Sequence, residues 1–148
     1  MTQLSAHFSL AELSVSANAR RLGLDNTPPP AIQQRLIQVA KQMERVRTRL
    51  GDHPITITSA YRSPAVNRSA NGAKTSAHLE GWAVDFICPG FGTPLAIAES
   101  LGASDLTYDQ LIHEFGSWVH LSFDPRRRMQ QLTIDGQGTR LGLWTIRP

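Results

Sequence analysis

Residues 108–123 read YDQLIHEFGSWVHLSF, which is the pattern of two strands joined by a tight turn. After Gly116-Ser117, alternation places Val119, Leu121 and Phe123 on one face of the strand and polar residues such as His120 on the other. Gly116 accepts the positive φ that short hairpin turns require, so the pattern favours a two-residue turn. The stretch predicts an antiparallel hairpin formed by Tyr108–Phe115 and Trp118–Phe123.

Helices are expected mainly in the first third of the chain. Ser9 and Glu12 have the spacing of a capping box, which predicts a short helix at this point. The prolines at positions 28–30 suit the start of a second helix. Apolar residues spaced by three and four positions predict that this helix is long, amphipathic and ends near Gly51. Its apolar stripe consists of Ile32, Leu36, Val39, Met43, Val46 and Leu50.

The remaining signals mark two strands, two helix starts and a second hairpin turn. In chain order they are Ile55–Thr58, Ser63-Pro64, Trp82–Ile87, Thr93-Pro94 and Asp135-Gly136. The Ser-Pro and Thr-Pro pairs combine a capping hydroxyl with the fixed φ of proline, and the second helix is expected to end near Gly102. Because helices cluster early and strands late, the sequence predicts an α+β fold with helices packed on a mainly antiparallel β-sheet.

The composition is that of a globular protein. The chain has 148 residues, of which 41% are hydrophobic and 18% are charged, so we expect a single domain covering residues 1–148. No run approaches the roughly 18 consecutive apolar residues of a membrane span. The N-terminus lacks the basic and apolar regions of a signal peptide, which favours synthesis in the cytoplasm. The single cysteine, Cys88, excludes an intramolecular disulfide and a multi-cysteine zinc site.

The net charge is +3, from 15 basic and 12 acidic residues. Nucleic-acid binders usually concentrate their cations on one face, whereas the only dense basic run here is Arg126–Arg128. That run is interpreted as a solvated loop or as a contact for an anionic partner. We therefore expect no nucleic-acid partner. The competing hypothesis of a nucleic-acid-associated protein that uses Arg126–Arg128 predicts binding that weakens steeply with salt.

Two histidines and one aspartate stand out as candidate metal ligands. Asp85 lies inside a predicted strand between apolar neighbours, where a buried carboxylate needs a cation or several donors to offset its desolvation. His78 precedes it in a loop, and His120 alternates away from the apolar face of its own strand. Two imidazoles and one carboxylate, with a fourth position open to water, form the ligand set of a catalytic Zn²⁺. The alternative is that each histidine merely caps a loop or binds a backbone carbonyl.

Three segments together resemble a known enzyme family. They are Ser76-x-His78-x6-Asp85, Trp118-Val119-His120 and the arginine in Ser59-Ala60-Tyr61-Arg62-Ser63. The pattern is similar to that of the zinc D-Ala-D-Ala carboxypeptidases and phage endolysin L-alanyl-D-glutamate peptidases. The resemblance implies that His78, Asp85 and His120 bind Zn²⁺ and that Arg62 contacts a carbonyl or carboxylate of the substrate.

Further resemblances extend through most of the chain. Phe8–Leu13 and Leu24–Pro29 are similar to the N-terminal part of small phage-encoded members. The resemblance also implies a fold of the hedgehog/DD-peptidase type. Because the hedgehog signalling domain has a similar zinc site and is not known for ordinary peptidase turnover, the fold alone does not establish catalysis.

A zinc peptidase also needs a general base that takes a proton from water and delivers it to the leaving amine. Several members of the family carry Glu or Asp three residues before the last histidine ligand. Ser117 stands at that position here and cannot act as a base at neutral pH. The nearest carboxylate is Glu114, which is either the base or a solvated or arginine-paired residue at the end of a strand.

The register of the hairpin decides between Glu114 and His113. With a two-residue turn, His113 lies opposite His120 and shares its face. With a three-residue turn that includes Phe115, Glu114 instead pairs with Trp118 and shares that face. We favour Glu114, because a carboxylate buried among apolar neighbours without a function is costly.

Three residues are expected to contact the substrate. Arg62 offers a planar fork of donors from a loop stiffened by a nearby proline, although an ordinary salt bridge would also explain it. Ser76 either donates a hydrogen bond within the site or holds its own loop. Trp118 either shapes the substrate cleft or packs in the core.

These observations favour a zinc metallopeptidase that cleaves an L-Ala-D-Glu or D-Ala-D-Ala bond in peptidoglycan stem peptides, with Arg62 and Glu114 as catalytic residues. We expect a monomer that acts at the bacterial cell wall, in the periplasm, after lysis or delivery through a holin or a virion. The alternative is a non-catalytic zinc-containing module, such as a phage tail or assembly protein. Ser117 in place of a carboxylate favours that alternative.

Overall fold

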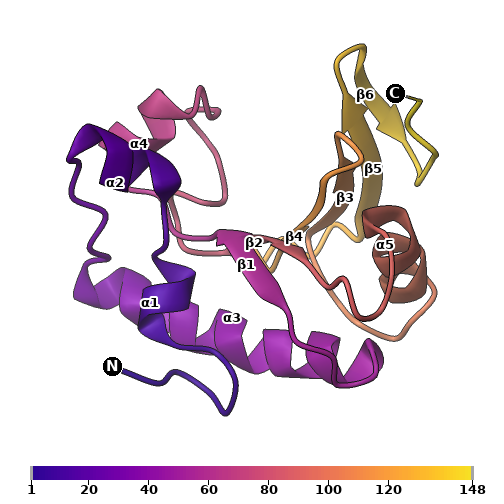
Figure 1. Ribbon diagram of the computed structural model, residues 1–148, viewed down its shortest axis with the longest axis horizontal. Coiled ribbons are helices and arrows are strands. Elements are labelled where there is room, and N and C mark those ends of the chain that lie inside the picture. The colour runs from indigo at the N-terminus through magenta and orange to yellow at the C-terminus, as the bar shows by residue number, and fades with distance from the viewer. Residues whose placement is uncertain (1, 148) are drawn as a thin grey trace. The chain divides into compact units, whose positions relative to one another are not determined.

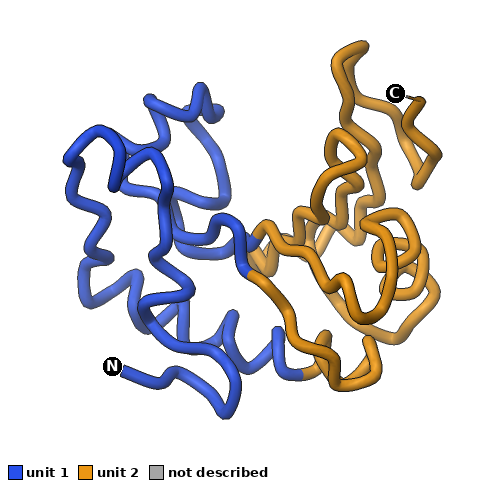
Figure 2. The backbone as a smooth tube through the Cα atoms, viewed as in Figure 1, with its two compact units in different colours: residues 1–44, 57–84 blue, residues 45–56, 85–148 orange. Residues whose placement is uncertain are grey.

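The computed structural model describes residues 2–147 (Figure 1). The chain forms two compact units, which Figure 2 shows in different colours. Unit 1 comprises residues 1–44 and 57–84, and unit 2 comprises residues 45–56 and 85–148.

Unit 1 contains three short helices, whose starts follow from their capping residues. Ser9 accepts a hydrogen bond from the Glu12 N–H, and the Glu12 carboxylate accepts one from the Ser9 N–H, which confirms the predicted capping box. Ser63 caps the helix that begins at Pro64, as predicted. The three helices are α1 (Leu10–Leu13), α2 (Ala17–Leu22) and α4 (Pro64–Ser69).

The long helix α3 (Pro30–Arg49) carries the predicted apolar stripe. Five of the six residues in the stripe are buried, and Ile32 is half-buried. The helix starts at the last of the three prolines because proline already has a helical φ and needs no N–H partner in the first turn. Within residues 2–147, no helix combines the length and apolar character that a membrane span requires.

The strands form one six-stranded sheet in the order β1-β2-β4-β3-β5-β6, so the chain is α+β as predicted. Most pairings are antiparallel, but β3 and β5 run parallel. The predicted turn at Asp135-Gly136 joins β5 and β6. In unit 2, helix α5 (Pro94–Gly102) is capped by Thr93 and packs against β3 and β4. The strands are β1 (Thr56–Ser59), β2 (Ala83–Ile87), β3 (Gln110–Glu114), β4 (Trp118–Ser122), β5 (Gln130–Asp135) and β6 (Gly138–Leu141).

The turn between β3 and β4 has three residues, not the two that Gly116-Ser117 suggested. Glu114 pairs with Trp118, so Phe115 belongs to the turn. Phe115 and Gly116 have φ values of 54° and 65°, and the Ser117 N–H donates to the Glu114 carbonyl. Two consecutive positive φ values are typical of a type I′ turn, and Ser117 is the extra residue before pairing resumes.

This register fixes which side chains share a face of the hairpin. Ile112 pairs with His120, and His113 pairs with Val119. Because side chains alternate along a strand, Glu114 and His120 lie on one face and His113 lies on the other. The three-residue alternative considered from the sequence is therefore the one that the chain adopts.

The surface loop that contains Arg126–Arg128 is fastened to the residue that precedes β3. Arg128 donates from Nε and Nη2 to the two oxygens of Asp109, each at 2.9 Å, and Arg126 Nη2 lies 3.6 Å from Asp109 Oδ2. Asp109 is buried, and the hydrogen bond from Arg128 is the main cause that lowers the pKa of its carboxyl from 3.8. Arg126 and Arg128 thus have an anionic partner, Asp109, within the chain itself.

We expect Asp109→Asn to lower the free energy of unfolding by about 2 kcal/mol at neutral pH, because the variant leaves Arg128 opposite a neutral amide. The depressed pKa of Asp109 means that its stabilisation is present above the unfolded pKa of 3.8 and is lost as the pH falls through the lower pKa of the folded state. Urea titrations between about pH 7 and about pH 3 should show a smaller acid-induced loss for the variant than for wild type.

Asp105→Asn is the matched control, since Asp105 is exposed. This change should alter the unfolding free energy by less than about 0.5 kcal/mol. Parallel acid-induced losses in wild type and Asp109→Asn would contradict the role given to the Asp109–Arg128 pair.

Candidate metal centre

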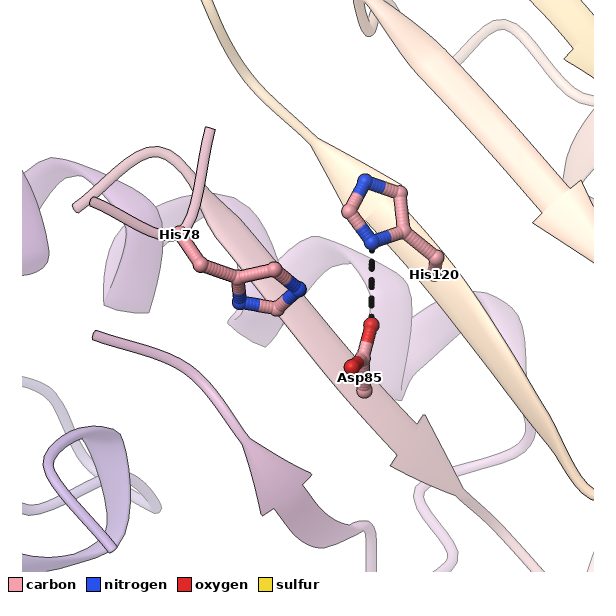
Figure 3. A group of neighbouring side chains, drawn as sticks. All are labelled: His78, Asp85 and His120. Atoms are coloured by element: carbon pink, nitrogen blue, oxygen red, sulfur yellow. Dashed lines mark hydrogen bonds and ion pairs between the residues drawn. The ribbon is translucent and has the colours of Figure 1, made fainter. Parts of the chain in front are cut away.

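The three predicted metal ligands lie together. His78 comes from the loop after α4, Asp85 from β2 and His120 from β4, and all three are buried. One potential ligand atom from each residue lies within 4.8 Å of the other two, and Figure 3 shows the side chains facing one another. Residues distant in sequence thus form a compact group of two imidazoles and one carboxylate.

Asp85 has the polar partner that its position inside a strand requires. His120 Nδ1 lies 2.9 Å from Asp85 Oδ1, and the two residues are only 8% and 4% exposed. A carboxylate this deeply buried would be costly without such a partner. Since both side chains project from paired strands, the backbone fixes their directions.

The His78 ring is oriented by a hydrogen bond to the backbone. Its Nδ1 lies 2.7 Å from the Ala60 carbonyl oxygen, which can only accept, so Nδ1 carries the proton. The neutral ring then has its lone pair on Nε2. Metal-binding histidines in proteins are commonly held in one tautomer by an outer partner of this kind.

The loop that carries His78 is held tightly within unit 1. Ser76 Oγ accepts a hydrogen bond from the His78 N–H at 3.2 Å. The His78 carbonyl accepts one from the Arg62 N–H at 3.1 Å. At Gly81, φ is +76° and an added Cβ would lie 2.8 Å from Ile32 Cγ2, so this position requires glycine.

This group of residues fits a Zn²⁺ ion. Neutral imidazole nitrogen and carboxylate oxygen are ligands that zinc accepts, and three protein ligands are typical of catalytic rather than structural zinc sites. The fixed tautomer of His78 leaves Nε2 unprotonated, so this nitrogen would be available to hold an ion. Burial of all three residues adds the low-polarity surroundings that strengthen such bonds.

Glu114 lies beside this group, whereas His113 does not. Glu114 Oε1 is 3.7 Å from His120 Nδ1, and its side chain is 17% exposed. His113 Nδ1 lies 2.9 Å from the Trp144 carbonyl oxygen on the opposite face of β3. Of the two bases considered from the sequence, only Glu114 shares the face of the metal ligand His120.

Arg62 is positioned by neighbours that the sequence analysis did not identify. Its Nε donates to Ser59 Oγ and its Nη1 donates to Asn67 Oδ1, both at 3.3 Å. Asn67 is buried on α4, and its Nδ2 also donates to the Ala73 carbonyl. Asn67 lies four residues after the predicted cap Ser63, but nothing in that spacing indicates that it contacts an arginine.

Trp118 lies next to the turn that separates β3 from β4. Its ring is tilted against Phe115, with centroids 5.5 Å apart. Its Nε1 is buried and, within residues 2–147, has no hydrogen-bond partner. A buried N–H of this kind is a donor that water or a ligand would satisfy.

The fold and the ligand group together define a metallopeptidase-like site. The family model described as Peptidase M15 matches residues 6–122, and the chain belongs to this family of zinc-dependent peptidases. The resemblance to the zinc D-Ala-D-Ala carboxypeptidases is thereby confirmed, and the chain is a peptidase by family. No curated protein is similar enough in sequence to count as a match.

We expect the purified chain, after chelation, to bind one equivalent of Zn²⁺ in a calorimetric titration. Alanine at His78, Asp85 or His120 should weaken the affinity for Zn²⁺ by at least about 100-fold. Loss of a residue that only orients a metal ligand usually weakens the affinity by less, about 10- to 100-fold. Circular dichroism of each variant checks that the fold is retained.

His53→Ala is the matched control, because His53 is exposed and lies outside the group. It should bind zinc as wild type does. Equal loss of affinity in His53→Ala, or full affinity in the three ligand variants, would contradict the assignment.

Proposed function

We propose that this chain is a zinc-dependent peptidase that hydrolyses a bond in the stem peptides of bacterial peptidoglycan. The observation that carries the proposal is the convergence of His78, Asp85 and His120 in a chain that belongs to the Peptidase M15 family. These three residues would hold the ion. When bound, Zn²⁺ would polarise the scissile carbonyl and make water a stronger acid.

Glu114 is the proposed general base. Its carboxylate accepts a proton from the attacking water and delivers it to the nitrogen of the leaving amine, so that one water and one peptide bond yield a carboxylate and an amine. Its distance of 3.7 Å from the His120 imidazole supports this role. The departure from the family pattern at Ser117 is thereby compensated from the end of β3.

Arg62 is proposed to hold the substrate. Its guanidinium donates to a carbonyl or carboxylate of the stem peptide, while Ser59 and Asn67 restrict its orientation. Trp118 is proposed to line the substrate site with its ring, and its buried N–H is a donor for bound water or substrate. Ser76 contributes by holding the loop of His78 and by a hydrogen bond within the site.

The proposal treats residues 1–148 as one peptidase domain that acts as a monomer at the bacterial cell wall. Cleavage at either an L-Ala-D-Glu or a terminal D-Ala-D-Ala bond is compatible with the ligand group, because the same carbonyl chemistry serves both. A role in phage lysis or in cell-wall remodelling would bring the chain to this substrate. Mass spectrometry of digested muropeptides identifies the bond from its new termini.

A second candidate function is a zinc-containing module without turnover, such as a phage tail or assembly protein. Ser117 favours it, since several members of the family carry a carboxylate at that position. This reading predicts one bound zinc and no new amino groups from peptidoglycan. The same digestion experiment therefore separates the two functions.

We expect wild type to release amino groups from purified peptidoglycan and Glu114→Gln to reduce the rate by about 10²- to 10⁴-fold, the usual contribution of a general base. Zinc affinity should be retained, because Glu114 is not a proposed ligand. His113→Gln is the matched control on the same strand and should retain most of the activity, because His113 lies on the other face.

A wild-type protein that holds zinc and releases no amino groups would favour the non-catalytic module. Full activity in Glu114→Gln together with its loss in well-folded His113→Gln would assign the base to His113 instead.

A further inference from the structure

The segment that follows the family match carries the net charge of the chain. Residues 123–148 contain five of the 15 basic residues and two of the 12 acidic ones, so their net charge is +3 and the preceding residues are neutral overall. The match to the Peptidase M15 family ends at residue 122. The segment therefore adds a charge that the matched region lacks.

Part of this segment forms a surface cavity of about 840 Å³. It lies between the β3–β4 turn, the β5–β6 turn and the C-terminal tail. Its volume is within the range of about 300–1,000 Å³ that small-ligand sites occupy. Its lining includes Phe115, Asp135, Arg140, Ile146 and Arg147.

The two arginines of the cavity differ in their partners. Arg140 Nη2 lies 3.4 Å from Asp135 Oδ2 and donates to the Thr145 carbonyl at 3.3 Å, so its charge is balanced locally. Arg147 is exposed, and the part of the chain that the structure describes provides no hydrogen bond or ion pair for its guanidinium. Among residues 2–147, Arg147 is thus the cavity arginine without a counter-charge.

The apolar part of the cavity comes from the hairpin tip and the tail. Phe115 is 48% exposed, so its ring is available to a ligand in the cavity. Ile146 approaches Gly116, where an added Cβ would lie 4.0 Å from the Ile146 Cβ. A ligand here would meet an aromatic ring, an aliphatic side chain and a guanidinium.

The cavity and the proposed base lie on different faces of the sheet. Ile134 pairs with Glu114 in parallel register, so the next residue, Asp135, projects from the opposite face. Arg140 pairs with Thr133 and projects from that same face as Asp135. A ligand in the cavity would therefore leave the face of Glu114 and His120 accessible.

We propose that this cavity binds a carboxylate-bearing stem peptide of peptidoglycan, as a second attachment point separate from the metal centre. The choice of ligand rests on the proposed function. A carboxylate accepts two parallel hydrogen bonds from one guanidinium, which suits Arg147, whose guanidinium has no partner among residues 2–147. A long phosphate polymer would instead favour a row of unpaired cations, and Arg140, which also lines the cavity, is already paired with Asp135.

Such an attachment point has a physical consequence for a polymeric substrate. Peptidoglycan presents many stem peptides on one network, so a peptide held in the cavity raises the effective concentration of its neighbours at the metal centre. The hairpin links the two sites, since Phe115 directly follows Glu114.

The test is an NMR titration of the isotopically labelled Glu114→Gln protein, which is expected to bind peptide without cleaving it. The probe is a synthetic stem peptide with free carboxylates, compared with the same peptide in which every carboxylate is a carboxamide. The carboxylate form should shift the amide resonances of Gly136, Thr145 and Ile146, and the carboxamide form should bind there about tenfold more weakly.

Adding Arg147→Gln should weaken binding at these amides about tenfold and abolish the difference between the two peptides. The matched control is Arg20→Gln, which removes the same charge from an exposed position in unit 1 and should leave the titration unchanged. Resonances of Leu121, next to the metal ligand His120, report separately on the metal centre.

The same titration is repeated with polyphosphate. The proposal is overturned if the resonances of the cavity amides do not shift with millimolar peptide or if both peptides bind equally. It is also overturned if only polyphosphate shifts these resonances. The amide readout does not depend on turnover. Absence of peptidoglycan hydrolysis by wild type would therefore count against the proposed function. If wild type hydrolyses peptidoglycan but the resonances of the cavity amides do not shift, only the second attachment point is contradicted.

Discussion

The site depends on the register of the β3–β4 hairpin. Side chains alternate along a strand, so a change of one residue in the turn would exchange the two faces of β3 and replace Glu114 by His113 beside the metal ligand. The positive φ values of Phe115 and Gly116 and the additional Ser117 set this register. A backbone feature of three residues thus decides which side chain has the position of a general base.

The ligand group shows how the surrounding fold prepares a metal centre. Strand positions direct Asp85 and His120, whereas His78 comes from a loop and is oriented by the Ala60 carbonyl. Glycine at position 81 and the hydroxyl of Ser76 secure that loop. Burying these polar groups is costly, and a bound divalent ion would offset the cost by satisfying their remaining lone pairs.

The regular elements could be predicted because their signals are local. The stripe of α3, the cap at Ser9 and the strand patterns each lie within a few turns of chain. The ligand set could be proposed from motif spacing and family resemblance. The length of the β3–β4 turn could not, because Phe115 adopts a positive φ that its residue type does not indicate. Likewise, the contacts of Arg62 with Asn67 and of Arg128 with Asp109 arise only from tertiary packing.

A crystal structure of the zinc-loaded protein, with anomalous diffraction measured on both sides of the zinc absorption edge, examines the central claim most directly. Our account predicts an anomalous peak about 2.0–2.2 Å from a nitrogen of His78, an oxygen of Asp85 and a nitrogen of His120. Zinc bound elsewhere, with these three side chains contacting only protein or water, would contradict it.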